Sequence, residues 1–287
     1  MNERTIRPRR SLIFAPGNRP EMIPKALATG ADIVTIDLED AIAPNDKTAA
    51  REGTLGWFAE NDDFGGVEPV VRVNCLRSVE GLADLQAIVE SPRPPPAIML
   101  PKVKSPGEVR VHEELVEQAA RPIRLHVIIE TNEGLDACIE IARSSELVDA
   151  LLFGGVDMAA ELRVEPTWNA LLHARSRAVH AAASAGVDLI DVPFLDLNDM
   201  EGLAREASAC AEIGFTGKGA IHPKQIPVLN ECFSPSEEEV ERARRVIAEF
   251  DGAGTGLVVI DGKLIEKPVL RSMHRILAIA ERMGRGA

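Results

Sequence analysis

The sequence LHVIIETNEGLDACIEIARSSELVDALLFGGVD, residues 125–157, contains the pattern that decides the fold. Two short apolar runs, 125–130 and 150–154, flank a segment near 134–144 that has the spacing of a helix. Continuous runs of valine, isoleucine and leucine are typical of parallel strands, which are buried on both faces. This stretch therefore predicts one strand–helix–strand unit.

The same alternation extends over most of the chain. Further apolar runs predict strands at 11–15, 33–38, 69–74, 97–101, 187–192 and 219–222. Helical patterns fill the intervals at 20–29, 46–60, 79–89, 106–119, 167–185 and 199–213. Eight strand–helix units favour an α/β fold, a (β/α)8 TIM barrel. An open Rossmann-like sheet is the alternative, but no GxGxxG motif opens a helix here.

The residues after the barrel pattern predict a smaller C-terminal part. We expect residues 1–235 to form the catalytic barrel and residues 236–287 to form a helix–hairpin–helix extension. Ser236 with Glu239 is typical of a capping box. The segment 254–265, GTGLVVIDGKLI, predicts a hairpin that turns at Asp261-Gly262, and a last helix follows at 268–283. The extension is short, so we expect it to pack or to form an oligomer.

Composition excludes several classes of protein. The chain has 287 residues and a formal net charge of −13, which argues against a general nucleic-acid partner. The four cysteines lack metal-binding spacing, which indicates a reduced compartment. The basic N-terminus is not followed by an apolar segment, and no run of about 18 apolar residues exists. We therefore expect a cytoplasmic protein with no membrane partner.

Polar residues gather where the predicted strands end. Barrel enzymes place their sites at the C-terminal ends of the strands, so these residues are the informative ones. Chance accounts for one or two polar residues at such positions but not for so many. The candidates at this rim are Asp37, Glu39, Asp40, Arg72, Asn74, Lys102, Glu130, Asp157, Asp191, Lys218 and His222.

Glu130 and Asp157 are the candidate metal ligands. They follow adjacent predicted strands, and carboxylate oxygens without cysteine or histidine suit Mg²⁺, which retains water ligands. A structural ion pair or a helix N-cap by Asp157 is the alternative interpretation.

Arg72 lies inside an apolar strand, where an unpaired guanidinium is costly. A bidentate carboxylate or a developing oxyanion is its natural partner, and an ion pair with a nearby acid is the alternative. Asp37, Glu39 and Asp40 either hold metal-bound waters or support the turn after their strand. Arg19 and Lys25, around the start of the first helix, are weak candidates for phosphate contacts.

Eight segments in this order resemble the citrate lyase β-subunit-like branch of the HpcH/HpaI aldolase superfamily, which includes malyl-CoA and citramalyl-CoA lyases. The resemblance covers roughly residues 10–283. The segments are RSLIFAPGNRPEMIPKAL, ADIVTIDLEDAIAPNDKTAAR, VVRVN, IMLPKV, IIETNEG, LLFGGVDMAAEL, GFTGKGAIHPKQI and GKLIEKP.

The resemblance implies a Mg²⁺-dependent lyase that cleaves or forms a carbon–carbon bond in a 3-hydroxyacyl-CoA, giving acetyl-CoA and a 2-oxo acid. Glu130 and Asp157 match the family's metal ligands, and Arg72 matches the arginine that contacts substrate oxygens. Arg19 and Lys25 match residues that contact CoA phosphates.

The resemblance also implies catalytic roles for three acidic residues. Glu39 and Asp40 match the acidic pair near the metal waters. Relatives often carry an aspartate that reaches a neighbouring subunit's site, and here that position is Glu266, one methylene longer. We expect Glu266 to transfer a proton in a homotrimer or hexamer.

Three other functions remain open at this point. A citrate lyase β subunit would act on an acyl-carrier-protein thioester and would need partner subunits. An aldolase of the same superfamily would act on free keto acids and would lack a thioester pocket. A non-catalytic acyl-CoA binder would keep the barrel without turnover, and only the change to Glu266 favours it.

Overall fold

The computed structural model describes residues 7–253, 257–260 and 263–284. The chain divides into two compact units, of which the larger is Arg9–Cys232. The other consists of Phe233–Ala287 together with Met1–Pro8. Each unit is described separately below.

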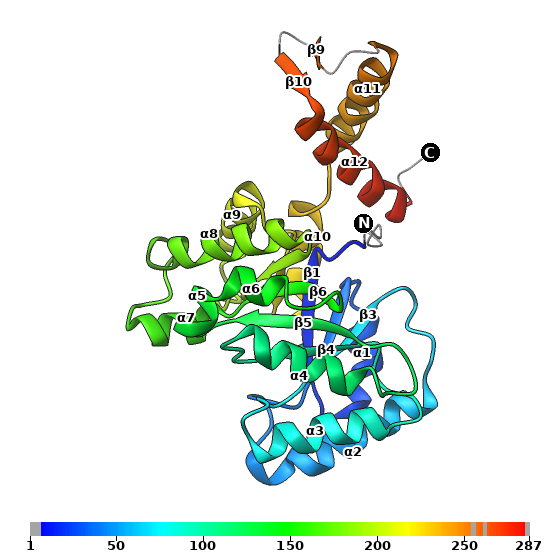
Figure 1. Cartoon of the computed structure of the whole chain (residues 1–287), viewed down its shortest axis with the longest axis vertical. Coiled ribbons are helices and arrows are strands. Elements are labelled where there is room, and N and C mark those ends of the chain that lie inside the picture. Colours follow the sequence, from blue (N-terminus) through cyan, green and yellow to red (C-terminus); the bar gives the residue numbers. More distant parts are fainter. Residues whose placement is uncertain (1–6, 254–256, 261–262, 285–287) are drawn as a thin grey trace. The chain divides into compact units, whose positions relative to one another are not determined.

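The larger unit is a closed barrel of eight parallel strands (Figure 1). Strand β1 pairs with β2 on one side and with β8 on the other, which closes the sheet. This architecture confirms the TIM barrel expected from the sequence. The strands are β1 Ser11–Pro16, β2 Ile33–Asp37, β3 Glu68–Arg72, β4 Ala97–Leu100, β5 Arg124–Ile129, β6 Val148–Phe153, β7 Asp188–Asp191 and β8 Gly217–Ala220.

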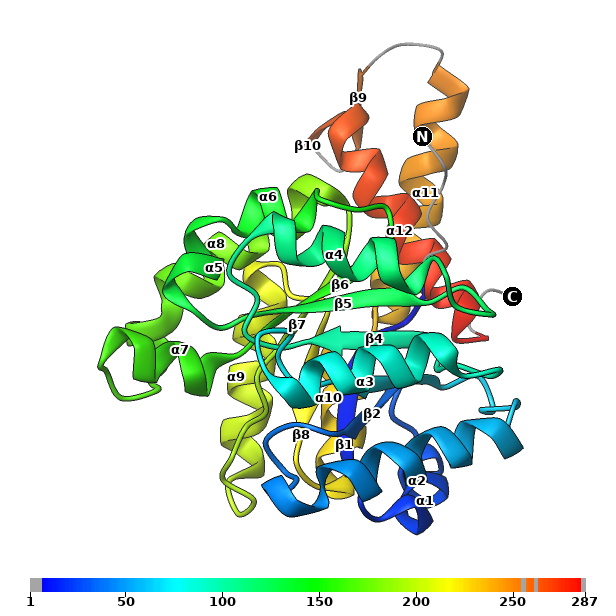
Figure 2. The same ribbon diagram turned by 60° about the horizontal axis from the view of Figure 1, so that its bottom comes forward.

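Helices connect the strands and cover the outside of the barrel (Figure 2). Several begin at a residue whose side chain accepts a hydrogen bond from the backbone three residues later, as Ser78, Thr131, Thr167 and Asp199 do. The helices are α1 Ile23–Leu27, α2 Lys47–Glu60, α3 Val79–Glu90, α4 Pro106–Val116, α5 Asn132–Asp136, α6 Cys138–Ala142, α7 Gly155–Leu162, α8 Trp168–Ala185, α9 Met200–Ile213 and α10 Ile226–Cys232.

Two connections differ from the sequence-based expectation. The single helix expected near 134–144 is split at Ala137 into α5 and α6. A short helix of eight residues, α7, follows β6, where no helix range was expected from the sequence. It begins directly after Gly154, so its first turn lies at the C-terminal end of the barrel.

The barrel interior is filled by every second residue of each strand. A buried apolar cluster joins Leu12, Val70, Met99, Ile128 and Ile190 across the barrel. Side chains alternate between the two faces of a strand, so the residues between these face the helices instead. Both faces of the strands are buried, which explains why the strands are continuous apolar runs in the sequence.

A buried charged cluster closes the N-terminal end of the barrel. Arg9 donates to both carboxylate oxygens of Glu68, at 2.7 and 2.8 Å, and also pairs with Asp149 and Asp188. Burial alone would raise the pKa of Glu68, but His126 and Arg9 outweigh it and hold the pKa well below its ordinary value. Paired charges at this end of a barrel serve stability rather than catalysis.

The C-terminal unit has its own small core. It contains α11 Glu237–Ala253, an antiparallel pair of β9 Leu257–Ile260 and β10 Lys263–Glu266, and α12 Lys267–Arg282. Val246, Phe250, Ile260 and Ile265 form its buried cluster.

The capping box expected at Ser236 and Glu239 is present at the start of this unit. The backbone N–H of Ser236 donates to the carboxylate of Glu239 at 2.8 Å, and Ser236 Oγ accepts from the N–H of Glu239. This confirms the capping box. The expected turn residues Asp261 and Gly262 lie outside the described residues. In the described part of the chain, no helix is both long and apolar enough to cross a bilayer. The cytoplasmic location stays a prediction.

Candidate active site

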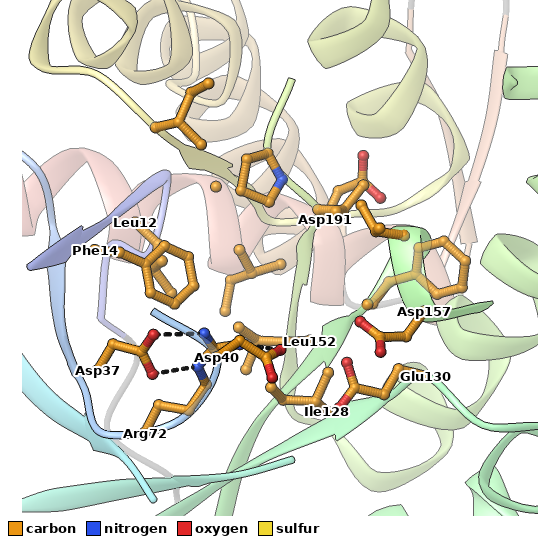
Figure 3. Close-up of a pocket in the computed structure, with 18 of the residues that line it drawn as sticks. Leu12, Phe14, Asp37, Asp40, Arg72, Ile128, Glu130, Leu152, Asp157 and Asp191 are labelled. Atoms are coloured by element: carbon orange, nitrogen blue, oxygen red, sulfur yellow. Dashed lines mark hydrogen bonds and ion pairs between the residues drawn. The ribbon is translucent and has the colours of Figure 1, made fainter. Parts of the chain in front are cut away.

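A cavity of about 360 Å³ opens at the C-terminal ends of the barrel strands. Its apolar lining includes Leu12, Phe14, Ile128, Leu152 and Ile190. These residues belong to the apolar cluster inside the barrel or pack against it, so the cluster forms the floor of the cavity. Figure 3 shows two groups of polar side chains in this cavity, Asp37 with Arg72 on the left and Glu130 with Asp157 on the right. Asp40 lines the cavity as well.

Arg72 and Asp37 form one side of the cavity. Asp37 ends β2 and Arg72 ends β3, and the strand register places the two residues opposite each other. Arg72 Nε and Nη2 donate to the two carboxylate oxygens of Asp37, both at 2.7 Å. Burial alone would raise the pKa of Asp37, but the bonds from Arg72 outweigh it and the pKa lies below its ordinary value. The guanidinium is therefore held in a fixed plane, 5.1 Å from the centre of the Phe14 ring.

Glu39 and Asp40 lie beside this pair and connect it to Lys102. Glu39 Oε2 forms an ion pair with Arg72 Nη1 at 3.2 Å, and Glu39 Oε1 forms a short contact with Lys102 Nζ. Lys102 Nζ also donates to Asp40 at 3.3 Å. Burial raises the pKa of Glu39 above its ordinary value despite these two cations. Glu39 and Asp40 thus lie beside the site as expected. Glu39 pairs with Arg72 and Lys102, and Asp40 pairs with Lys102.

Glu130 follows β5 and is nearly fully buried, at 4% exposure. One carboxylate oxygen accepts from the backbone N–H of Lys102 at 2.7 Å. Lys102 has a left-handed φ of 54°, and this strained backbone aims its N–H at the carboxylate. Burial raises the pKa of Glu130 to about 8, and repulsion from the Asp157 carboxylate adds to the effect.

Asp157 approaches Glu130 from the first turn of α7 (Figure 3). The N-cap of this helix is Gly154, so the expectation that Asp157 might only cap a helix is wrong. No described cation forms an ion pair with Glu130 or Asp157. The two carboxylates repel each other, and a divalent cation between them would remove that repulsion.

The donor set fits magnesium better than a softer metal. Among the described residues, no group of three or more histidine, cysteine or acidic side chains is placed to hold a metal. Two carboxylates in a polar corner suit Mg²⁺, which usually binds through one or two carboxylates and keeps several waters. Glu130 and Asp157 are therefore the residues that would hold it.

A second cavity of about 350 Å³ shares Glu130 and Asp157 with the first. Arg77, Lys102 and Lys104 also line it. These cations are already engaged, since Arg77 pairs with Glu108, and Lys104 donates to Glu133. Glu130 and Asp157 thus lie between two cavities and line both of them.

Two residues expected at this rim face the opposite way. Asp191 and Lys218 lie between the strands and the helices, where Lys218 Nζ donates to Asp191 at 2.5 Å and to Glu206 at 2.7 Å. Strand alternation explains the difference, because their neighbours Ile190 and Gly219 line the cavity. The side chain of Asp191 points away from Glu130 in Figure 3. Asp191 thus lines the cavity with its carboxylate turned toward the helices, and Lys218 is not among the lining residues.

Lys47 supports the site and was missed by the sequence reasoning. Its ammonium donates to the carbonyl oxygens of Leu38 and Glu39, at 3.0 and 2.9 Å, and to Asn74 Oδ1. Asn74 in turn donates to the Leu38 carbonyl and to buried Asp84. Together they fix the backbone that carries Glu39. The available signal was a lysine at the first position of a helix, where the dipole disfavours a cation.

The remaining candidates lie outside the cavity lining. Arg19 follows β1, is exposed and forms a 3.6 Å ion pair with Glu21. Lys25 is exposed on α1. Glu266 ends β10 in the C-terminal unit and is the N-cap residue of α12, but its exposed side chain forms no capping hydrogen bond. Exposed His222 accepts from the N–H of Lys224 and orients the chain locally. The functional roles of Arg19, Lys25 and Glu266 stay predictions.

Comparisons with known proteins agree with this architecture. The family model HpcH/HpaI aldolase/citrate lyase matches residues 10–223, and a model of a TIM-barrel C–C bond lyase matches residues 165–284. Citrate lyase subunit beta of Leuconostoc mesenteroides is 33% identical over 95% of this chain and 93% of its own. The mitochondrial citramalyl-CoA lyase of Homo sapiens is 33% identical over 95% of this chain and 86% of its own.

A solved structure is similar over the same extent. The CitE protein of Mycobacterium tuberculosis, in complex with magnesium, acetoacetate and coenzyme A, is 32% identical and has a TM-score of 0.74. The match covers 96% of this chain and 97% of that one. Family model, curated relatives and solved structure thus agree with the barrel described above. The chain belongs to the HpcH/HpaI aldolase/citrate lyase family and is a carbon–carbon lyase.

Proposed function

We propose that the protein cleaves, or reversibly forms, a 3-hydroxyacyl-CoA such as citramalyl-CoA or malyl-CoA, giving acetyl-CoA and a 2-oxo acid. The single observation that carries this proposal is the arrangement of the cavity. A carboxylate pair, Glu130 and Asp157, and a fixed guanidinium, Arg72, line the same 360 Å³ space. A 2-oxo acid needs these two kinds of group, a site for a hard cation and a donor for oxygen-centred negative charge.

The cation expected at Glu130 and Asp157 is Mg²⁺. When bound, it would act as a Lewis acid toward the oxygens of the 2-oxo acid. The support from this chain is the repulsion between buried Glu130 and half-buried Asp157 and the absence of a paired cation among the described residues. Relatives point the same way, since the similar CitE structure is in complex with magnesium.

Arg72 is the donor that stabilises negative charge on the carbonyl oxygen. Its two bonds to Asp37 fix the guanidinium before substrate binds, so little reorganisation is needed during the reaction. One well-placed donor of this kind contributes about 3 kcal/mol to the transition state. Glu39 and Asp40 keep Arg72 and Lys102 in place and provide carboxylates for proton transfer or for water near the metal ligands.

A second copy of the chain would complete the site. Glu266 is exposed in its own unit, as a residue that reaches a neighbouring subunit must be. We assign it proton transfer to or from the enolate carbon, within a homotrimer or hexamer. Arg19 and Lys25, both exposed beyond the end of β1, would contact the CoA phosphates.

A citrate lyase β subunit that acts on an acyl-carrier-protein thioester is the second candidate. The identity to the Leuconostoc subunit, 33%, equals that to the human citramalyl-CoA lyase. The phosphopantetheine arm is common to both carriers, so the barrel accommodates either thioester.

The test is a cleavage assay with malyl-CoA, methylmalyl-CoA, citramalyl-CoA and citryl-CoA, each with Mg²⁺ or with EDTA. Release of acetyl-CoA or propionyl-CoA is measured. Metal-dependent cleavage of one thioester supports the proposal. If the folded protein binds Mg²⁺ and CoA but cleaves none of them, the free-CoA lyase assignment is wrong. Cleavage only of a carrier-protein thioester then supports the subunit, and binding without turnover supports the non-catalytic binder.

A further inference from the structure

Lys102 connects two groups of acidic side chains at the rim of the barrel. It lies just after β4, and its backbone N–H donates to the Glu130 carboxylate at 2.7 Å. Its ammonium forms a short contact with Glu39 and donates to Asp40 at 3.3 Å. Glu39 and Asp40 are called the acidic pair below. One residue thus binds a candidate metal ligand with its backbone and the acidic pair with its side chain.

The backbone of Lys102 is held in the conformation that these contacts need. Its φ of 54° is left-handed, a region that residues with a Cβ rarely adopt. Its carbonyl oxygen accepts from Arg77 Nη2 at 2.6 Å, so the N–H and the carbonyl group are both engaged. A strained conformation persists only where surrounding contacts fix it. Because the backbone conformation sets the direction of Cβ, the conformation that supplies the N–H to Glu130 also directs the ammonium toward Glu39.

The charges of the acidic pair and of Lys102 act on the candidate metal ligands. Burial, together with repulsion from Asp157 and Glu39, raises the pKa of Glu130 to about 8, and the N–H and the ammonium of Lys102 oppose this increase. Asp40 lines the same cavity as Glu130. A divalent cation binds more tightly where more carboxylates are available to it. Lys102 is therefore placed to decide which of these carboxylates remain available.

We propose that Lys102 is a positioning residue whose ammonium holds the acidic pair, so that only Glu130 and Asp157 bind the cation directly. This inference rests on the proposed function, because it takes Glu130 and Asp157 as the metal ligands. Mg²⁺ usually binds through one or two carboxylates and keeps its other positions for water or substrate. A third or fourth carboxylate would occupy positions that the oxygens of the substrate need.

The test compares the full-length wild type with Lys102→Met, by calorimetric titration with Mg²⁺ alone and by cleavage of the preferred CoA thioester. Methionine keeps the backbone N–H and a long unbranched side chain but removes the charge. We expect Mg²⁺ to bind at least about threefold more tightly, because a positive charge is lost and the acidic pair is released, and kcat to fall at least about tenfold. Lys102→Arg keeps the charge and should return both quantities toward the wild-type values. A fall in kcat with unchanged or weaker Mg²⁺ binding overturns the inference, since loss of a merely structural contact would give that result.

A second variant at the same residue separates the charge from the backbone. Lys102→Gly also removes the ammonium, and glycine adopts a φ of 54° without strain. It should therefore show the same tighter Mg²⁺ binding as Lys102→Met, and wild-type affinity in this variant overturns the inference. If the wild type binds Mg²⁺ but cleaves no thioester, the proposed function fails, and the titrations decide the inference by themselves. If the wild type binds no Mg²⁺, the metal assignment and the inference fail together.

Lys104→Met is the matched control for the loss of a cation. Lys104 lines the second cavity together with Lys102, but its ammonium donates to exposed Glu133 at 2.9 Å. We expect this variant to keep the Mg²⁺ affinity and the kcat of the wild type. An equal gain in Mg²⁺ affinity in Lys104→Met and Lys102→Met overturns the inference, because net charge alone would then account for the gain.

Discussion

Gly154 sets the position of the Glu130 carboxylate, and its replacement by alanine gives a sharp test of the site. A Cβ at residue 154 would lie 2.4 Å from Glu130 Oε2 and 2.5 Å from Glu130 Cβ. Gly154 has a φ of −86°, which alanine adopts without strain, so the effect of the variant is purely steric.

The size of the effect follows from these distances. Ordinary contacts begin at 3.4 Å, so Glu130 must move by about 1 Å to accommodate the methyl group. A misplacement of about 1 Å at a catalytic group costs on the order of 100-fold in rate. Overpacking of this kind destabilises a fold by about 1 to 3 kcal/mol, which a domain of this size tolerates. We therefore expect a folded Gly154→Ala protein with weak Mg²⁺ binding and about 1% of the activity.

The assay is Mg²⁺ titration by calorimetry, cleavage of the preferred thioester, and urea unfolding on the same preparations. Gly56→Ala is the matched control, because Gly56 lies in α2 with no atom within 4 Å of an added Cβ. That variant should be as active as the wild type and slightly more stable. Wild-type Mg²⁺ affinity and activity in Gly154→Ala would refute the assignment of Glu130 as a metal ligand.

Three further predictions concern the charged groups. Asp37→Asn removes the carboxylate that fixes Arg72, so kcat/KM should fall by about 100-fold with Mg²⁺ affinity unchanged; a loss confined to Mg²⁺ affinity contradicts this. Lys218→Met removes one of the two cations that pair with buried Asp191, the other being Arg175, and should lower the free energy of unfolding by about 1 to 3 kcal/mol in urea, while kcat of the folded protein stays near the wild-type value. Glu68 has a lowered pKa in the folded state, so its pairing stabilises the fold above its ordinary pKa of 4.5 and is lost as the pH falls below that value. Glu68→Gln should therefore make the unfolding free energy less steep below about pH 4.5, and an unchanged slope in urea titrations counts against it.

The sequence by itself determined the architecture and the family. Hydrophobic periodicity is a local property, so the runs at 69–74, 125–130 and 150–154 predicted buried parallel strands before any contact was known. The same runs indicated which polar residues end a strand, and Arg72 and Glu130 lie in the cavity as expected. Capping signals are equally local, and the Ser236–Glu239 box is present in the structure.

Only the tertiary structure decided which of those polar residues share one space. Asp37 and Asp191 both end a strand, yet Asp37 faces the cavity and Asp191 faces the helices, because a shift of one residue reverses the direction of a side chain. The register between β2 and β3 then places Asp37 against Arg72. Lys47 and Gly154 act through contacts with Glu39 and Glu130 respectively. The contact of Gly154 with Glu130 joins the ends of neighbouring strands, and Lys47 also bonds Asn74, 27 residues away, so no local pattern encodes this arrangement.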